Sequence, residues 1–444
     1  MPSRELYGRI KQEIDTIETV DAHEHNALTE EEYLQLHADF ARFFTNYTID
    51  DLESAGMIIP DRLEFQETGG KTLRVDGREL SLEEKWAYIK PWWENTRYTG
   101  YGRALIHSIR RLFNIDDLTD NTYVDISEKL AGLGKPGIYR KMLKDICGLK
   151  YSVNDVNFKL QPQAFKKIDR SLYHFIARTR QFTHTYLRTE REYLERTFNR
   201  TIRNLDDLLD TLDEQLDEWI QHGCLGLKIP YAYEHDLFFE DTSREDADRV
   251  MRRSFALKRI LGEDEQISLD EGRPFKNYMV HRVLDRAERL GLPIIIHTGV
   301  QAGIGNSVTN SNAVALSNLF AKYPTVKFHL LHANYPYMKE AACLAKQFTN
   351  VTLDLTWVHI IVPAGAREGL SHFLDTVPVN KIHGFGGDVH FTECVYGTLE
   401  VARENIAHVL AEKVETGNMT ETQAVETAHK LLQKNIMNIL NIEG

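Results

Sequence analysis

Short apolar runs recur along the chain and alternate with longer amphipathic stretches. Apolar runs of about four to seven residues between turn residues are typical of buried strands in a parallel sheet. The stretch 205–219 instead places its leucines on one stripe, which predicts a helix buried on one side. Further helices are predicted at 277–290, 312–322 and 337–347, and a closing helix at 420–440. The predicted strands are 19–20, 149–153, 173–178, 224–227, 292–296, 326–331, 351–355 and 382–387.

Strands that alternate with helices predict repeated βαβ units, and eight of them complete an α/β fold of the (β/α)8 TIM-barrel type. Residues 27–145 do not follow this rhythm and contain several amphipathic stretches with tryptophans. We interpret them as a mostly helical insertion after the first strand that caps the barrel. We therefore expect a single barrel domain over 1–444 with the cap at 27–145.

Composition narrows the class of protein. The chain has 444 residues, 42% of them apolar, and a formal net charge of -13, which argues against a nucleic-acid partner. Its four cysteines form no C-x-x-C pair, as expected for free thiols in a reducing compartment. The first 20 residues carry charges throughout, and no apolar run is long enough for a membrane span. We expect a cytoplasmic homo-oligomer that acts on a small molecule, without a membrane partner.

Metal-binding side chains follow several of the predicted strands. His23 and His25 follow the first strand, His297 the fifth, His332 the sixth and Asp388 the eighth. In this barrel type the active site lies at the carboxyl ends of the strands, and positions two apart on a strand share a face. Each residue alone has a structural explanation, such as a core histidine or a turn aspartate after glycines. Together they predict a metal site.

Imidazole nitrogen and carboxylate oxygen are the proposed donors. This set suits Zn²⁺, with Mn²⁺, Fe²⁺ and Co²⁺ as alternatives. An ion with an open position lowers the pKa of a bound water and polarises a substrate oxygen. Asp388 is then a candidate for both metal ligand and proton carrier.

The segments VDAHEHN and GFGGD, with His297 and His332 between them, resemble the amidohydrolase superfamily. The resemblance implies a centre of one or two metal ions and hydrolysis of a small amide, lactone or ester. It assigns His23 and His25 as ligands from the first strand, His297 from the fifth, and Asp388 as ligand and proton shuttle from the eighth. His332 is assigned a catalytic or metal-binding role.

Lys228 decides between two versions of this centre. The segment GCLGLKI resembles the fourth strand of phosphotriesterase-like members, in which a carbamylated lysine bridges two metals. With that modification, His297 and His332 would serve a second ion. Without it, the site holds one ion and His332 contacts water or substrate. Lys228 would then bind substrate as an ammonium group, or lie outside the pocket.

The helical insertion and Trp357 resemble uronate isomerase, and the chain also resembles the amidohydrolase domain of FluG-type proteins. These resemblances leave a sugar-acid isomerase and a non-oxidative decarboxylase as alternatives to the hydrolase. A binding protein without activity is the fourth hypothesis, disfavoured by the full ligand set. The candidate substrate contacts are Tyr231, Arg178 and Trp357. An arginine there would hold a carboxylate-bearing substrate through a bidentate pair.

Overall fold

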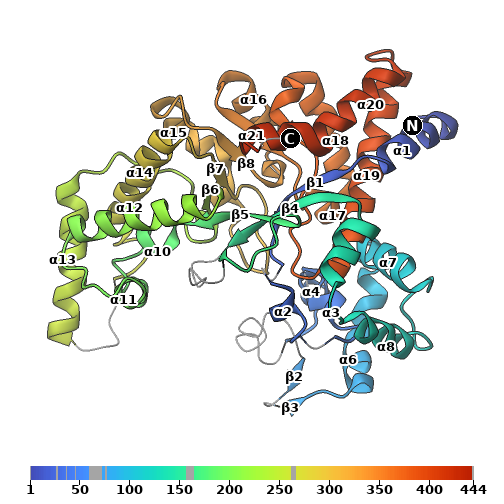
Figure 1. The fold of residues 1–444 in the computed structure, drawn as a ribbon, viewed down its shortest axis with the longest axis horizontal. Coiled ribbons are helices and arrows are strands. Elements are labelled where there is room, and N and C mark those ends of the chain that lie inside the picture. Colours follow the sequence, from blue (N-terminus) through green and yellow to red (C-terminus); the bar gives the residue numbers. More distant parts are fainter. Residues whose placement is uncertain are drawn as a thin grey trace.

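A sheet of eight parallel strands forms the centre of the protein (Figure 1). The computed structural model describes residues 2–26, 29–36, 38–45, 47–59, 73–75, 78–156, 165–261 and 267–442. The strands follow one another in space in their chain order, as right-handed βαβ units require. They are β1 (Thr19–Glu24), β4 (Leu149–Val156), β5 (Tyr173–Arg178), β6 (Cys224–Ile229), β7 (Ile294–Ile296), β8 (Phe328–Leu330), β9 (Val351–Asp354) and β10 (Ile382–His383).

Helices pack around this sheet, and those after β5 alternate with the strands. The predicted leucine stripe of α12 faces the interior, because Leu205, Leu208, Leu212 and Leu216 are all buried. The helices of the barrel are α1 (Arg4–Asp15), α10 (Arg180–Thr183), α11 (Arg188–Thr197), α12 (Leu205–Gln221), α13 (Arg244–Leu261), α14 (Arg273–Leu290), α15 (Ser317–Lys322), α16 (Met338–Gln347), α17 (Val358–Ile361), α18 (Pro363–Thr376), α19 (Thr392–Glu415), α20 (Glu421–His429) and α21 (Asn435–Ile439).

The segment between β1 and β4 is mostly helical and lies on one side of the barrel (Figure 1). A short antiparallel pair, β2 (Arg74–Val75) and β3 (Arg78–Glu79), accompanies its helices. The α-helices are α2 (Glu30–Tyr33), α3 (Arg42–Thr45), α4 (Thr48–Ser54), α6 (Leu82–Thr96), α7 (Gly100–Phe113) and α8 (Tyr123–Leu133), and a π-helix spans Arg140–Ile146.

This architecture confirms the predicted (β/α)8 barrel with a helical insertion after the first strand. The helix predicted at 312–322 is shorter than expected, since α15 begins at Ser317 after 3-10 turns at Val308–Ser311 and Ala313–Leu316. The predicted closing helix is α20 and α21, joined by a π-helical turn at Lys430–Lys434. The limits of a separate cap, 27–145, and the single-domain description stay predictions.

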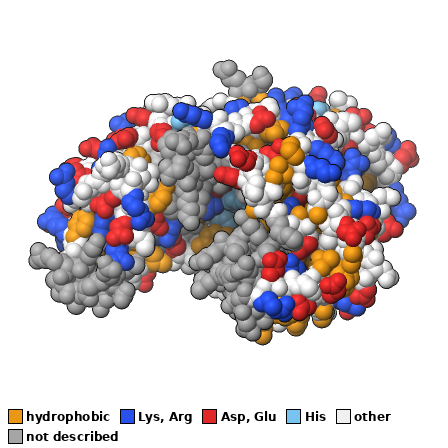
Figure 2. Space-filling view, turned by 60° about the horizontal axis from the view of Figure 1, so that its bottom comes forward, with side chains coloured by type: hydrophobic (Ala, Val, Ile, Leu, Met, Phe, Trp, Pro, Cys, Tyr) orange, Lys and Arg blue, Asp and Glu red, His pale blue; other side chains and the backbone are white. Residues whose placement is uncertain are grey.

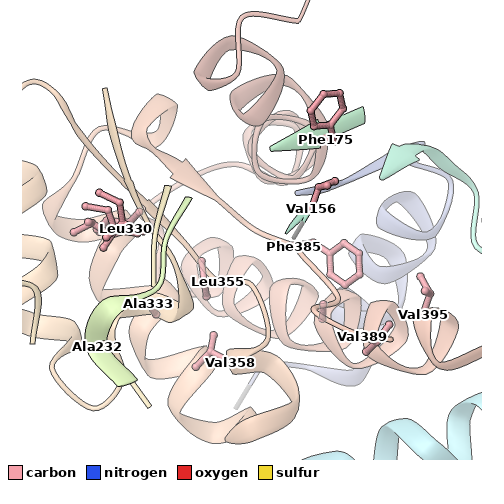
Figure 3. Close-up of a cluster of buried hydrophobic side chains, with 14 of the residues drawn as sticks. Val156, Phe175, Ala232, Leu330, Ala333, Leu355, Val358, Phe385, Val389 and Val395 are labelled. Carbon is pink, nitrogen blue, oxygen red and sulfur yellow. The ribbon is translucent and has the colours of Figure 1, made fainter. Parts of the chain in front are cut away.

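Apolar residues next to the polar residues at the carboxyl ends of the strands are buried in the core. Val156, Ala333 and Val389 lie in one buried cluster with Phe385 and Leu355 (Figure 3). Each of the first three follows directly after a polar residue of interest, namely Asp155, His332 and Asp388. In β4 the chain is extended and adjacent residues point to opposite sides, so packing Val156 into the core directs Asp155 to the other side. His332 and Asp388 instead have left-handed φ angles of 64° and 55°, and each is followed by a residue of the core cluster that anchors the chain there.

The helical insertion between β1 and β4, called the cap below, packs on α19, the helix that follows β10. Helix α7 packs along α19, where a Cβ on Gly397 would overlap the carbonyl oxygen of Ala104. Arg42 of the cap donates a 2.9 Å hydrogen bond to Glu393 of α19, and Tyr33 also contacts this carboxylate. Both partners of the ion pair are buried, so separating the cap would leave charges unpaired in the interior. None of the helices in the described parts of the chain is long and apolar enough to cross a membrane.

Candidate metal centre

Three side chains meet at the junction of β1 and the segment after β10. One ligand atom each from His23, His25 and Asp388 lies within 4.8 Å of the others. His25 Nε2 is 2.9 Å from Asp388 Oδ1, and the rings of His23 and His25 are 5.1 Å apart at 83°. Figure 2 shows histidine side chains in a hollow of the molecular surface. The H-x-H pair and the aspartate, which are far apart in sequence, thus share one site.

The backbone before Asp388 runs close to its neighbours. A Cβ on Gly386 would overlap Thr356 Oγ1, and one on Gly387 would overlap Glu24 Oε1. Asp388 itself has φ of 55°, in the left-handed region that non-glycine residues seldom adopt. Its amide donates to the carbonyl of His23 at 2.8 Å, which holds this conformation. The glycines of GFGGD therefore permit the close approach that brings Asp388 to the histidines.

The protonation states suit a cation. Burial lowers the pKa of His23 well below its ordinary value, and the nearby charge of Lys228 lowers it further. Burial acts to raise the pKa of Asp388, but its electrostatic interactions with the imidazoles of His23 and His25 and its hydrogen bond with His25 hold it well below its usual range. Neutral imidazole and ionised carboxylate are the forms that bind metals. His23 Nδ1 is buried and has no hydrogen-bond partner among the described residues, so the donor set fits a divalent ion.

His297 and His332 form a second pair beside this triad. His332 Nε2 is 3.0 Å from His297 Nδ1 and 3.7 Å from Asp388 Oδ2. His332 Nδ1 lies 3.1 Å from the carbonyl oxygen of Thr356, which accepts only, so Nδ1 carries the proton of the neutral ring. Burial lowers the pKa of both histidines. The lone pair on His332 Nε2 consequently faces the site.

Lys228 is buried beside the same cluster. Its Nζ is 3.2 Å from His23 Nε2 and 3.9 Å from Asp155 Oδ2. Burial lowers the pKa of Lys228 to about 8. Asp155 also accepts two hydrogen bonds from Arg178, at 2.8 and 2.9 Å, so Arg178 is held in a bidentate pair with the protein. The pair leaves Nη1 of the guanidinium as the donor nitrogen that Asp155 does not engage.

Aromatic side chains from separate elements line this cluster. The hydroxyl of Tyr47, which precedes α4 of the cap, donates to Asp388 Oδ1 at 3.0 Å. The Tyr47 ring lies 4.6 Å from that of Trp357, which in turn lies 5.3 Å from His332. Trp357 is buried, has φ of 64°, and its Nε1 has no hydrogen-bond partner among the described residues. His390 stacks on His25 with 5.3 Å between ring centroids.

The structure thus brings together most of the residues selected from the sequence. The set is His23, His25, Lys228, His297, His332, Trp357, Asp388 and, through Asp155, Arg178. Tyr231 lies elsewhere, because it is fully buried and its hydroxyl contacts Thr179 and Thr183 at 3.2 and 2.6 Å. Tyr233, two residues further on, is the tyrosine of this loop whose ring reaches His297, at 4.8 Å.

Sequence reasoning missed three other members of the site. Asp155 follows the predicted strand 149–153, which ended too early because its apolar run stops there; β4 continues to Val156. His390 was recognisable in principle, since it stands two residues after Asp388 in D-V-H. Tyr47 lies in the insertion and carries no local signal for this contact.

The fold and the site define a class: (β/α)8-barrel proteins with histidines and an aspartate gathered at the carboxyl ends of the strands. The sequence pattern of the family described as Amidohydrolase matches residues 202–393. Protein fluG of Emericella nidulans is 30% identical over 219 residues, which are 48% of this chain and 25% of that protein. The chain therefore spans about a quarter of the length of this curated relative.

Solved structures share the whole fold. A uronate isomerase from Thermotoga maritima has a TM-score of 0.80 at 14% identity, covering 99% of this chain and 98% of its own. A glucuronate isomerase from Caulobacter crescentus has a TM-score of 0.75 at 15% identity, covering 99% and 95%. A putative metal-dependent hydrolase from Lactobacillus casei has a TM-score of 0.65 at 15% identity, covering 97% of each chain. The chain is therefore similar to the Amidohydrolase family over residues 202–393 and shares its fold with these solved structures over nearly its whole length.

Proposed function

We propose that this protein is a metal-dependent hydrolase that cleaves a small amide, lactone or ester. The observation that carries the proposal is the cluster of His23, His25 and Asp388, with His23 and Asp388 buried, at the carboxyl ends of the barrel strands. A divalent ion held there, with Zn²⁺ as the first candidate, would lower the pKa of a water molecule and polarise the substrate carbonyl. One ion fits the triad, and Lys228 and the pair His297 and His332 leave a second ion as the alternative.

Asp388 is the proposed proton carrier. It is ionised at neutral pH, and its Oδ1 is held by Tyr47 and His25, at 3.0 and 2.9 Å. A carboxylate fixed in this way accepts the proton of the attacking water and delivers it to the leaving group. Its second oxygen, Oδ2, lies on the side of His332.

His332 is the proposed second polar contact to the substrate. Its Nδ1–H is committed to the carbonyl of Thr356, which fixes the ring and presents Nε2 to the site. The indole of Trp357 and the ring of Tyr47 would cover the substrate and exclude water. The Nε1–H of Trp357, which has no hydrogen-bond partner among the described residues, and Nη1 of Arg178 would be the donors for a carboxylate-bearing substrate.

A uronate-type isomerase is the second candidate. The specific observation in its favour is the likeness to uronate and glucuronate isomerases over nearly the whole chain, insertion included. In an isomerase the ionised Asp388 would move a proton between neighbouring carbon atoms of the sugar acid, in place of a water proton.

A substrate screen of metal-loaded protein separates the two candidates. Lactones, esters and N-acyl compounds are tested for hydrolysis, and glucuronate and galacturonate for a ketose acid. Elemental analysis of the same sample gives the metal content, which is about one ion per chain for the triad alone and about two for a bridged centre. Ketose formation without any hydrolysis would replace the first candidate by the second.

Asp388→Asn tests the proton carrier. We expect turnover to fall by about 100-fold or more, because positioned acid–base groups contribute 10²–10⁴-fold. Asp375→Asn is the matched control, since this exposed carboxylate pairs with Lys413 on the outer helices. Normal turnover in Asp388→Asn would remove Asp388 from the mechanism.

A further inference from the structure

The junction between the last and the first strand of the barrel is built differently from the other junctions. β1 forms its ladder with β4, and β10, which has two residues, forms its ladder with β9. The segment after β10 then runs beside β1, joined by backbone hydrogen bonds from Ala22 to Phe385, from Asp388 to His23 and from His25 to Val389. The metal-ligand triad lies across this junction, with histidines on one side and Asp388 on the other.

Two buried carboxyl groups, Asp21 and Glu24, reinforce this junction from the β1 side. The amide of Gly387 donates to Asp21 Oδ1 at 3.0 Å, and the amide of Val389 donates to Glu24 Oε2 at 2.7 Å. These amides belong to the residues immediately before and after Asp388. Asp21 Oδ1 also accepts from the amide of His23 at 3.2 Å, so one carboxyl oxygen contacts both sides of the triad.

Both side chains are fully buried, which makes these contacts costly to lose. Asn26 contributes to the same arrangement, since its Nδ2 donates to Glu24 Oε2 and to the carbonyl of Val389, both at 3.1 Å. A Cβ on Gly387 would overlap Glu24 Oε1, so the loop is in direct contact with the carboxyl group.

We propose that Asp21 and Glu24 are positioning residues that clamp the backbone on both sides of Asp388 and thereby set the geometry of the metal-ligand triad. The inference rests on the proposed metal centre. Asp388 needs such contacts because its backbone is in the left-handed conformation, and a strained residue keeps its conformation only where its surroundings hold it. Without the clamp, the loop relaxes and the carboxylate leaves its place beside His25.

The test measures Zn²⁺ affinity by competition with a chromophoric chelator, together with the visible absorption spectrum of the Co²⁺-loaded protein. We expect Glu24→Ala and Asp21→Ala to bind Zn²⁺ about 10- to 100-fold more weakly, as is usual for residues that orient metal ligands. Their Co²⁺ spectra should change shape, because the coordination geometry changes. Glu24→Gln keeps a carbonyl oxygen for the Val389 amide and should restore affinity and spectrum.

Glu393→Gln is the control for mere destabilisation. Glu393 is equally buried but contacts Arg42 and Tyr33, so its loss should lower stability while Zn²⁺ affinity stays within about threefold. If Glu24→Ala does not fold, Gly387→Ala takes its place, since its methyl group displaces the same carboxyl. Wild-type protein that binds no Zn²⁺ would overturn the proposed centre itself. Wild-type binding with unchanged affinity in the folded alanine variants would overturn only the clamp.

Discussion

Replacing Gly397 with alanine puts one methyl group into the crossing of α7 and α19, where the cap meets the barrel. The added Cβ would overlap the carbonyl oxygen of Ala104 and lie 2.7 Å from Ser108 Oγ. Neither neighbour is the end of a long flexible side chain, so the helices must move apart. The amide of Gly397 also donates to Ser108 Oγ at 3.0 Å, and that hydrogen bond weakens when they do.

The magnitude follows from three contributions. Overpacking costs about 1–3 kcal/mol, and because the overlapped atom belongs to the backbone this site lies in the upper half of that range, at about 2–3 kcal/mol; the weakened hydrogen bond costs up to about 1 kcal/mol more. Alanine favours the helix over glycine by about 1 kcal/mol, which offsets part of the loss. We expect the free energy of unfolding to fall by about 1–3 kcal/mol.

Denaturant unfolding measures the free energy of unfolding of Gly397→Ala and, for comparison, of a second variant, Gly132→Ala. Gly132 lies in cap helix α8 with no described atom within 4 Å of a new Cβ, so the same substitution there should stabilise the protein by up to about 1 kcal/mol. Opposite signs for the two variants support the packed crossing. If Gly397→Ala changes the free energy by less than about 0.5 kcal/mol, the cap is not docked as described.

Two further predictions concern single side chains. Tyr47→Phe removes the hydroxyl that donates a hydrogen bond to Asp388. Hydrogen bonds to charged groups contribute about 1.5–3 kcal/mol, so kcat/KM should fall by about 10-fold or more. An unchanged kcat/KM would exclude this contact from catalysis. Burial acts to raise the pKa of Glu234, but its hydrogen bond to His184 and the charge of Lys276 hold it well below the usual range. The ionised Glu234 therefore stabilises the fold above the ordinary carboxyl pKa, and this stabilisation is progressively lost as pH falls below about 5. The difference in free energy of unfolding between wild type and Glu234→Gln should be smaller at pH 4 than at pH 7, and denaturant unfolding at the two pH values measures it.

The barrel was predictable because its signal is local. Each strand is an apolar run and each helix has its own stripe, so periodicity alone locates β6 and α12. The ends of the elements were less predictable. β4 continues through Asn154 and Asp155, whose burial depends on partners from other strands, such as Arg178. The sequence shows polar residues there and not the partners that allow their burial.

The candidate site divides in the same way. By itself the sequence determined the residues that follow directly from strand ends, His23, His25, His297, His332 and Asp388, because a parallel barrel gathers all strand ends on one face. Only the tertiary structure decided which tyrosine reaches the site and that Tyr47, 341 positions before Asp388, contacts it. Such contacts depend on how the loops and the cap fold over the barrel, and these long-range interactions have no periodic pattern in the chain.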